Sequence, residues 1–233
     1  MAKNKVKTKS MPRLLRQRFH NAMLQLRSGD PFEEFSRMAS YWSDVTGASW
    51  SWIWLKNSHT ETWEIVGVGR NSENQPENQS TAGTLSEFPD DIPVEMGPNS
   101  NSIAEMVTKK GESIFVKNVS SFCEDFEGIE YDVCNAEWFL QNHIESFETI
   151  PFEIESESYG VTVQGVACCH FGNSDSRVIH EQKSLSIMGG LTGQAIANVY
   201  ESLFFRLILK LNNLAATYPV SYTHLTLPTI CSV

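Results

Sequence analysis

The stretch Ala48-Ser-Trp-Ser-Trp-Ile-Trp-Leu55 decides the fold class of this 233-residue chain. Its three tryptophans recur at every second position, which places their side chains on one face of an extended backbone. Aromatic and β-branched residues also favour strands over helices. A turn over residues 57–60 separates this stretch from Trp63-Glu-Ile-Val-Gly-Val-Gly69, which we expect to be its hairpin partner.

Elements on both sides of this hairpin alternate between helical and extended patterns. Asp30 and Pro31 are typical of a helix start, and Gly47 of a helix end. The order is helix, two strands, helix, strand, irregular segment, two strands and helix, over residues 30–47, 48–55, 63–69, 97–111, 113–119, 120–142, 150–157, 159–171 and 181–216. This order predicts an α+β domain around a mainly antiparallel sheet.

Charge divides the chain into a basic start and an acidic remainder. The sequence has 18 basic and 28 acidic residues, a net charge of −10, but residues 1–28 contain eight bases and no acid. This basic arm is either a solvated flank or a contact for nucleic acid or anionic lipid. The composition excludes bulk disorder, collagen and a small disulfide-rich protein. No apolar run reaches the roughly 18–20 residues that span a bilayer, and no secretory signal follows the basic arm, so we expect a cytoplasmic protein without a membrane span.

Four segments, in the correct order, resemble those of a GAF domain. They are Lys110-Gly-Glu-Ser-Ile-Phe-Val-Lys-Asn-Val119, His143-Ile-Glu-Ser-Phe-Glu-Thr-Ile-Pro-Phe152, Tyr159-Gly-Val to Gly165-Val-Ala, and Gln194-Ala-Ile-Ala-Asn-Val-Tyr-Glu201. The resemblance implies a GAF/PAS-like central antiparallel sheet with helices on one face, a loop-roofed ligand pocket on the other, and a long C-terminal helix. It also implies a regulatory, small-molecule-sensing module of a signal-transduction protein, such as a two-component system.

The irregular segment supplies the candidate ligand-binding residues, because binding residues concentrate on loops held by a rigid scaffold. The polar and aromatic candidates are Cys123, Asp125, Tyr131, Asp132, Trp138 and His143. Each of these side chains has the alternative role of solvating and packing a long loop. The ligand is unidentified, and no cofactor is required by the sequence.

The C-terminal helix is the candidate dimerisation and signalling element. Residues 203–209 are apolar around nearly the whole helix, more than one buried face needs, and such a surface is typical of an interface. The candidate contacts are Leu203, Phe204, Leu207, Ile208 and Leu211. We expect a homodimer that passes ligand state to an output domain, with a missing domain covering the patch as the alternative.

The chain is accordingly divided into four parts. Residues 1–29 form the basic arm and a lead-in helix, 30–201 the GAF-like domain, and 202–219 the continuation of the signalling helix. Residues 220–233 resemble the translation of a sequencing adapter, so we expect a non-native tail on a fragment whose natural C-terminal part is missing.

Two further functions compete with sensing. Cys123 and Cys134 suggest a thiol reductase acting on free methionine sulfoxide, as in one GAF branch, although their acidic neighbours disfavour a thiolate. A ligand-free dimerisation domain is the structural alternative. Cys168 and His170 share a face of a predicted strand, but structural zinc needs about four ligands, so we expect core packing and no metal. No catalytic set of residues is recognised.

Overall fold

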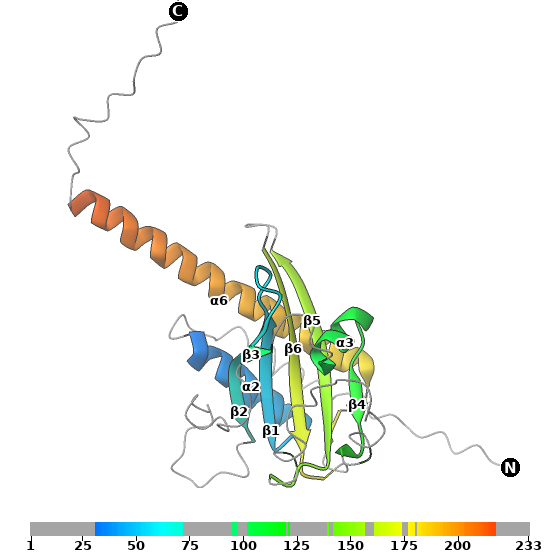
Figure 1. The fold of residues 1–233 in the computed structure, drawn as a ribbon. Coiled ribbons are helices and arrows are strands. Elements are labelled where there is room, and N and C mark those ends of the chain that lie inside the picture. Colours follow the sequence, from blue (N-terminus) through cyan, green and yellow to red (C-terminus); the bar gives the residue numbers. More distant parts are fainter. Residues whose placement is uncertain are drawn as a thin grey trace, which may run out of the picture. The chain divides into compact units, whose positions relative to one another are not determined.

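The computed structural model describes residues 31–71, 95–96, 102–119, 121, 139, 142–156, 161–173, 177–179 and 181–217. Their elements, in chain order, are α2 (Pro31–Thr46), β1 (Trp50–Lys56), β2 (Trp63–Arg70), β3 (Glu95–Met96), α3 (Ile103–Lys110), β4 (Ile114–Val116), β5 (Ser146–Ser156), β6 (Val161–Phe171) and α6 (Gln182–Thr217). The strands form a six-stranded sheet in the order β3-β2-β1-β6-β5-β4, and every neighbouring pair is antiparallel (Figure 1). The predicted α+β class with a central antiparallel sheet is confirmed.

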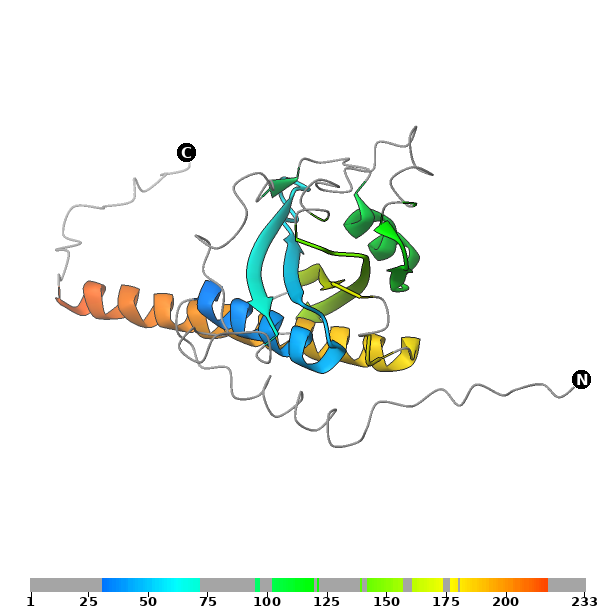
Figure 2. The same cartoon turned by 90° about the horizontal axis from the view of Figure 1, so that it is seen from below.

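Helices α2 and α6 cover one face of the sheet, and α3 lies on the other (Figure 2). The indole Nε1 of Trp42 on α2 donates a hydrogen bond of 2.9 Å to Thr192 Oγ1 on α6, which joins the two helices. Helix α6 lies against β5, where Gly189 and Gly193 pass close to Phe152. The two helices thus form one packed layer on one face of the sheet, and α3 lies on the opposite face.

Close contact between α2 and β2 depends on glycine. A Cβ on Gly69 would lie 2.0 Å from the backbone nitrogen of Ser40, and one on Gly67 would lie 2.5 Å from the carbonyl oxygen of Phe35. Small side chains allow a similarly close contact between α2 and β1, where the hydroxyl of Ser43 donates a hydrogen bond of 2.9 Å to the hydroxyl of Ser51. The helix layer is therefore packed backbone against backbone and leaves no room for a ligand at these glycines.

The boundaries of several elements differ from those expected. Helix α2 ends at Thr46 with Gly47 in the left-handed region (φ 79°), as predicted. Strand β5 begins at Ser146, four residues before the predicted 150, because the buried Glu148 has a partner that the strand pattern does not reveal. The two-residue strand β3 was not predicted. The predicted lead-in helix over 12–27 lies outside the described residues.

The described chain divides into two compact units after Val199. The first unit contains the sheet, α2, α3 and the start of α6, and the second contains the rest of α6. Helix α6 as a whole is one continuous helix of 36 residues. Within the described parts of the chain, no helix has the length and apolar character required to cross a membrane.

Candidate functional site

The candidate site is built on the face of the sheet that carries Trp50, Trp52 and Trp54, here called the tryptophan face. Strand β1 lies between β2 and β6, so each tryptophan has a neighbour on both sides. The three rows across these strands are Arg70–Trp50–His170, Val68–Trp52–Cys168 and Ile65–Trp54–Val166. The alternation seen in the sequence thus places an aromatic strip along the middle of the sheet, on the side opposite α2 and α6.

An aromatic cluster surrounds His170 on the tryptophan face. The imidazole centroid lies 4.2 Å from the ring of Trp52, 5.5 Å from Phe139 and 6.4 Å from Phe147. His170 is 3% exposed. Burial lowers the pKa of His170 to about 3, and a hydrogen bond to the Trp50 backbone, which favours the protonated ring, offsets only part of this effect. The imidazole is therefore neutral at physiological pH and forms part of an apolar, ring-lined surface.

Helix α3 forms the roof over part of this face. Its N-cap Ser102 accepts a hydrogen bond from the backbone nitrogen of Glu105, and Gly111 ends the helix in the left-handed region at φ 68°. Ala104 and Val107 are buried in the same hydrophobic cluster as Trp52, Trp54 and Trp63. The roof thus rests on the sheet through two small side chains, over a floor made mostly of large rings.

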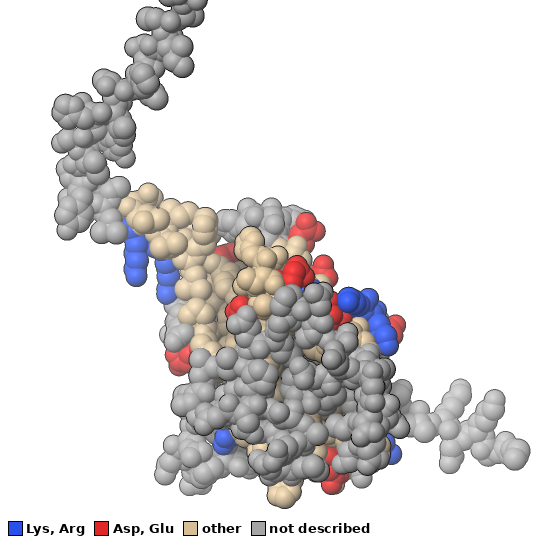
Figure 3. All heavy atoms as spheres, in the orientation of Figure 1, with Lys and Arg blue, Asp and Glu red and all other residues tan. Residues whose placement is uncertain are grey.

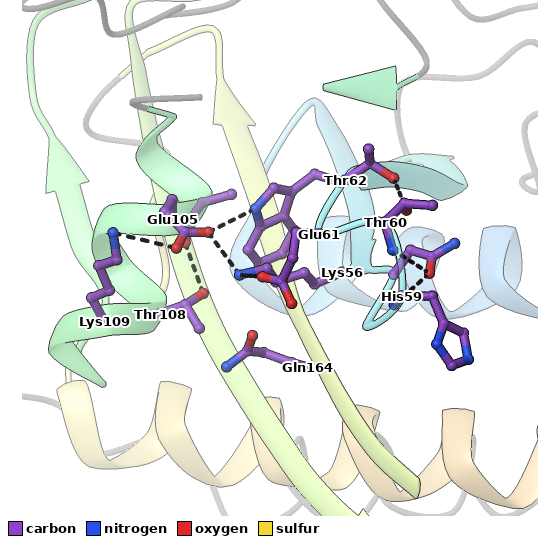
Figure 4. Close-up of polar contacts among 12 residues, drawn as sticks. Lys56, His59, Thr60, Glu61, Thr62, Glu105, Thr108, Lys109 and Gln164 are labelled. Atoms are coloured by element: carbon purple, nitrogen blue, oxygen red, sulfur yellow. Dashed lines mark hydrogen bonds and ion pairs between the residues drawn. The ribbon is translucent and has the colours of Figure 1, made fainter. Parts of the chain in front are cut away.

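A polar network ties the roof to the β1–β2 hairpin (Figure 4). Glu105 Oε2 accepts from Trp63 Nε1 at 3.0 Å and pairs with Lys56 Nζ at 3.3 Å, while Lys56 also pairs with Glu61 at 2.7 Å. Burial on its own would raise the pKa of Glu105, but the Trp63 indole together with Lys56 and Lys109 outweighs burial and lowers it. Glu105 is consequently an anion that anchors α3.

The opposite face carries a buried ion pair. Arg177 Nε donates to Glu148 Oε2 at 2.7 Å, and its guanidinium lies 4.1 Å from the Phe115 ring centroid. Burial raises the pKa of Glu148 although Arg177 and Ser113 favour its ionised form. This pair joins β5 to the segment before α6, and it stabilises the fold rather than the tryptophan face.

Most of the predicted ligand-binding residues lie outside the described residues: Cys123, Asp125, Tyr131, Asp132 and Trp138. His143 is described; it is exposed, in a turn with φ 54°, just before β5. Val119, just before the irregular segment, and Phe139, within it, are both buried in the cluster on the tryptophan face. Of the residues next to and within this segment, these two therefore lie at the candidate site.

The two adjacent cysteines of β6 lie on opposite faces, and Cys168 shares a face with His170 as predicted. Cys169 is buried against Ser51, and burial raises its pKa to about 12, so its thiol is unreactive. Cys168 is half-buried, with its sulfur 3.6 Å from Thr149 Oγ1. Among the described residues, no group of three or more His, Cys, Asp or Glu side chains is placed to hold a metal ion.

Sequence reasoning missed Arg70, Trp63 and Glu105 as members of this region. Arg70 alternates with the inward-facing Gly67 and Gly69, which was the available signal for that residue. Trp63 has the same parity as these glycines and reaches the tryptophan face only through the register shift opposite Ile53 and Trp54, which no alternation pattern predicts. Glu105 is linked to Trp63 across 42 residues, and no local pattern predicts such a contact.

Comparison with known proteins identifies the architecture. No protein-family model and no curated protein matches the sequence. A solved structure, the GAF domain from Acinetobacter phosphoenolpyruvate-protein phosphotransferase, superposes with a TM-score of 0.51 over 80% of this chain and 93% of that one, at 13% identity. The chain has the fold of a GAF domain.

Two more structures with this fold are similar. The GAF domain of a phosphoenolpyruvate-protein phosphotransferase from Coxiella burnetii matches with a TM-score of 0.50 over 83% of this chain and 98% of that one, at 11% identity. The bacteriophytochrome RpBphP3 from R. palustris matches with a TM-score of 0.52 at 12% identity; the match covers 88% of this chain but 42% of the phytochrome. In the GAF fold of this chain, the tryptophan face is the side of the sheet that α2 and α6 leave uncovered.

Proposed function

We propose that this chain is a regulatory GAF module that senses a small molecule at the tryptophan face, within a larger signal-transduction protein. The observation that carries the proposal is the contrast between the two faces of the sheet. One face is packed backbone to backbone by α2 at Gly67 and Gly69. The other presents rings and a neutral histidine beneath a short helix. Ligand sites of small molecules are typically apolar and aromatic with a few polar groups.

The irregular segment completes the proposed site. Val119, which precedes the segment, and Phe139, within it, are buried on the tryptophan face, and the backbone nitrogen of Val119 donates to Glu145 O at 2.9 Å. We therefore retain the predicted ligand-binding side chains Cys123, Asp125, Tyr131, Asp132 and Trp138 as part of the proposal.

A ligand screen tests the proposal. Thermal unfolding of the full chain is measured with a defined panel of nucleotides, amino acids, 2-oxo acids, haem and bilins. We expect at least one class to raise the melting temperature, because a ligand that binds only the native state stabilises it by mass action. Cys168→Met, which adds volume on the tryptophan face, should reduce the shift; Gln194→Met, on the exposed side of α6, should not. A panel without any stabilising compound would contradict sensing.

We also propose that α6 is the signalling element and that it dimerises. Tyr200, Phe204, Leu207 and Leu211 recur at the four-three-four spacing of a coiled-coil seam and are 43% to 55% exposed. Arg206 lies on the side of the helix away from Phe204 and Leu211, whereas Lys210 follows Leu203 by seven residues and borders the seam. Figure 3 shows basic side chains projecting from one side of this otherwise uncharged part of the helix. Leu203 and Ile208 border the seam and complete the candidate dimer contact.

Sedimentation equilibrium tests the dimer with a matched pair of variants. Leu207→Glu places a charge in the seam and should weaken self-association by at least about tenfold, because each chain of the dimer would bury an unpaired charge. Arg206→Glu changes the charge by more but lies outside the seam and should leave the association constant nearly unchanged. Equal effects of the two variants, or a monomeric wild-type chain at high micromolar concentration, would contradict the proposal.

A further inference from the structure

The guanidinium of Arg70 lies over the indole ring of Trp50, at the edge of the tryptophan face. Arg70 is the last residue of β2 and lies on the tryptophan face, in register with Trp50, which is in register with His170. Its guanidinium carbon is 3.8 Å from the centroid of the Trp50 ring, so the planar group stacks on the indole. Such stacking fixes the orientation of the guanidinium and leaves its donor edge available in the plane.

No acidic side chain neutralises Arg70 within the described part of the chain. Its Nε is shielded from solvent and has no acceptor there. By contrast, Arg37 pairs with Glu33 and Arg177 pairs with Glu148. A buried donor without an acceptor costs free energy, and native proteins seldom leave one unexplained.

The row that contains Arg70 also lacks acids. Across the sheet its members are Arg70, Trp50, His170, Phe147 and Val116. His170 is neutral, so Arg70 supplies the only formal charge in the row, a positive one, in a chain whose net charge is −10. The row therefore combines one guanidinium group, held against Trp50, with neighbouring aromatic side chains.

We propose that Arg70 is an oxyanion-binding residue, and that it binds the carboxylate or phosphate of a small molecule whose planar part lies on the tryptophan face. The inference rests on the proposed sensing function of that face. A guanidinium donates two parallel hydrogen bonds to either oxyanion, which gives both affinity and orientation. An oxyanion would also provide the acceptor that Nε lacks.

The test uses two planar oxyanions, benzoate and phenyl phosphate, with benzamide as the neutral analogue. Binding to the full chain is measured by tryptophan fluorescence, since Trp50 lies under Arg70, and by thermal unfolding. We expect at least one oxyanion to bind saturably and at least about tenfold more tightly than benzamide, because a hydrogen bond to a charged group is worth about one to two decades in affinity. The preferred oxyanion distinguishes a carboxylate ligand from a phosphate ligand.

Variants assign the effect to Arg70. Arg70→Gln should weaken oxyanion binding by at least about tenfold. Arg70→Lys keeps the charge but loses the planar fork, so it should also weaken binding; this variant decides the matter if the Gln variant does not fold. Arg37→Gln, on α2 and paired with Glu33, is the matched control and should bind as the wild type does.

The outcomes separate this inference from the proposed function. Unchanged oxyanion affinity in both Arg70 variants would overturn it. Benzamide binding as tightly as the oxyanions would overturn the role of Arg70 while supporting a ligand site on the tryptophan face. Failure of both oxyanions to bind would overturn it as well, and if no compound of the broader panel bound either, the proposed sensing function would fail with it.

Discussion

Removing the imidazole of His170 should change how the stability of the chain depends on pH. The folded-state pKa of His170 is about 3, against 6.5 for an unperturbed histidine, because the ring is buried among Trp52, Phe139 and Phe147. Below pH 6.5 the unfolded chain binds a proton that the folded chain cannot bind until about pH 3. Proton binding therefore stabilises the unfolded state as the pH falls through this window, and the free energy of unfolding decreases.

The size of the effect follows from these two pKa values. Between pH 7.5 and pH 5.0 the proton taken up by the unfolded chain should lower the free energy of unfolding by about 2 kcal/mol through His170 alone. In His170→Phe this contribution is absent, so the variant should lose less stability than the wild type over the same range. His170→Gln, which is uncharged and smaller, checks that the result does not depend on ring packing.

Urea unfolding at pH 7.5 and pH 5.0 provides the assay. Comparing the pH effect between wild type and variant removes the contributions of Glu105 and Glu148, which both proteins share. His143→Asn is the matched control, because His143 is exposed and its φ of 54° suits asparagine. If the pH effect in His170→Phe and His170→Gln equalled that of the wild type within about 0.5 kcal/mol, burial of a neutral His170 would be refuted.

Two pairs of substitutions test the packing. Gly69→Ala should destabilise the fold by about 1–3 kcal/mol or more, because the new Cβ would lie 2.0 Å from the nitrogen of Ser40. In Gly190→Ala the new Cβ meets no atom within 4 Å, so this substitution should stabilise α6 by up to about 1 kcal/mol. Equal stabilities of the two variants in chemical unfolding would contradict the packing. Arg177→Met should lower the free energy of unfolding by about 3–5 kcal/mol, because Glu148 stays buried without its partner. Adding Glu148→Leu should restore part of this loss. If the effects of the two substitutions on the free energy of unfolding simply added, the two side chains would not interact.

The sequence predicted the features that depend on local periodicity. The alternation of Trp50, Trp52 and Trp54 predicted β1 and its single-faced tryptophans, and Pro31 and Gly47 marked the limits of α2. The same period of two placed Cys168 and His170 on one face of β6. These predictions held because backbone geometry alone fixes which side chains share a face.

The candidate site depends on contacts that periodicity does not encode. Glu148 meets Arg177 across 29 residues, and Trp63 meets Glu105 across 42, so neither pair has a local signal. The stacking of Arg70 on Trp50 depends on the register of β1 and β2, which shifts at a bulge between Ile53 and Trp54. The sequence therefore indicated which face would carry the rings, but not which charged groups would border it.

Ligand protection of Cys168 tests the central claim, small-molecule sensing at the tryptophan face, most directly. In the wild-type chain, peptide mapping follows Cys168, half-buried on that face, separately from Cys123, Cys134 and Cys231; its neighbour Cys169 is buried on the other face with a pKa of about 12. The measurement is the alkylation rate of Cys168, by mass spectrometry, with and without the panel compound that stabilises the chain. We predict at least about tenfold slower alkylation with the compound bound, because a ligand both covers the thiol and suppresses opening of the native state. An unchanged rate at a saturating concentration of a stabilising compound would show that the ligand binds elsewhere and would contradict the account.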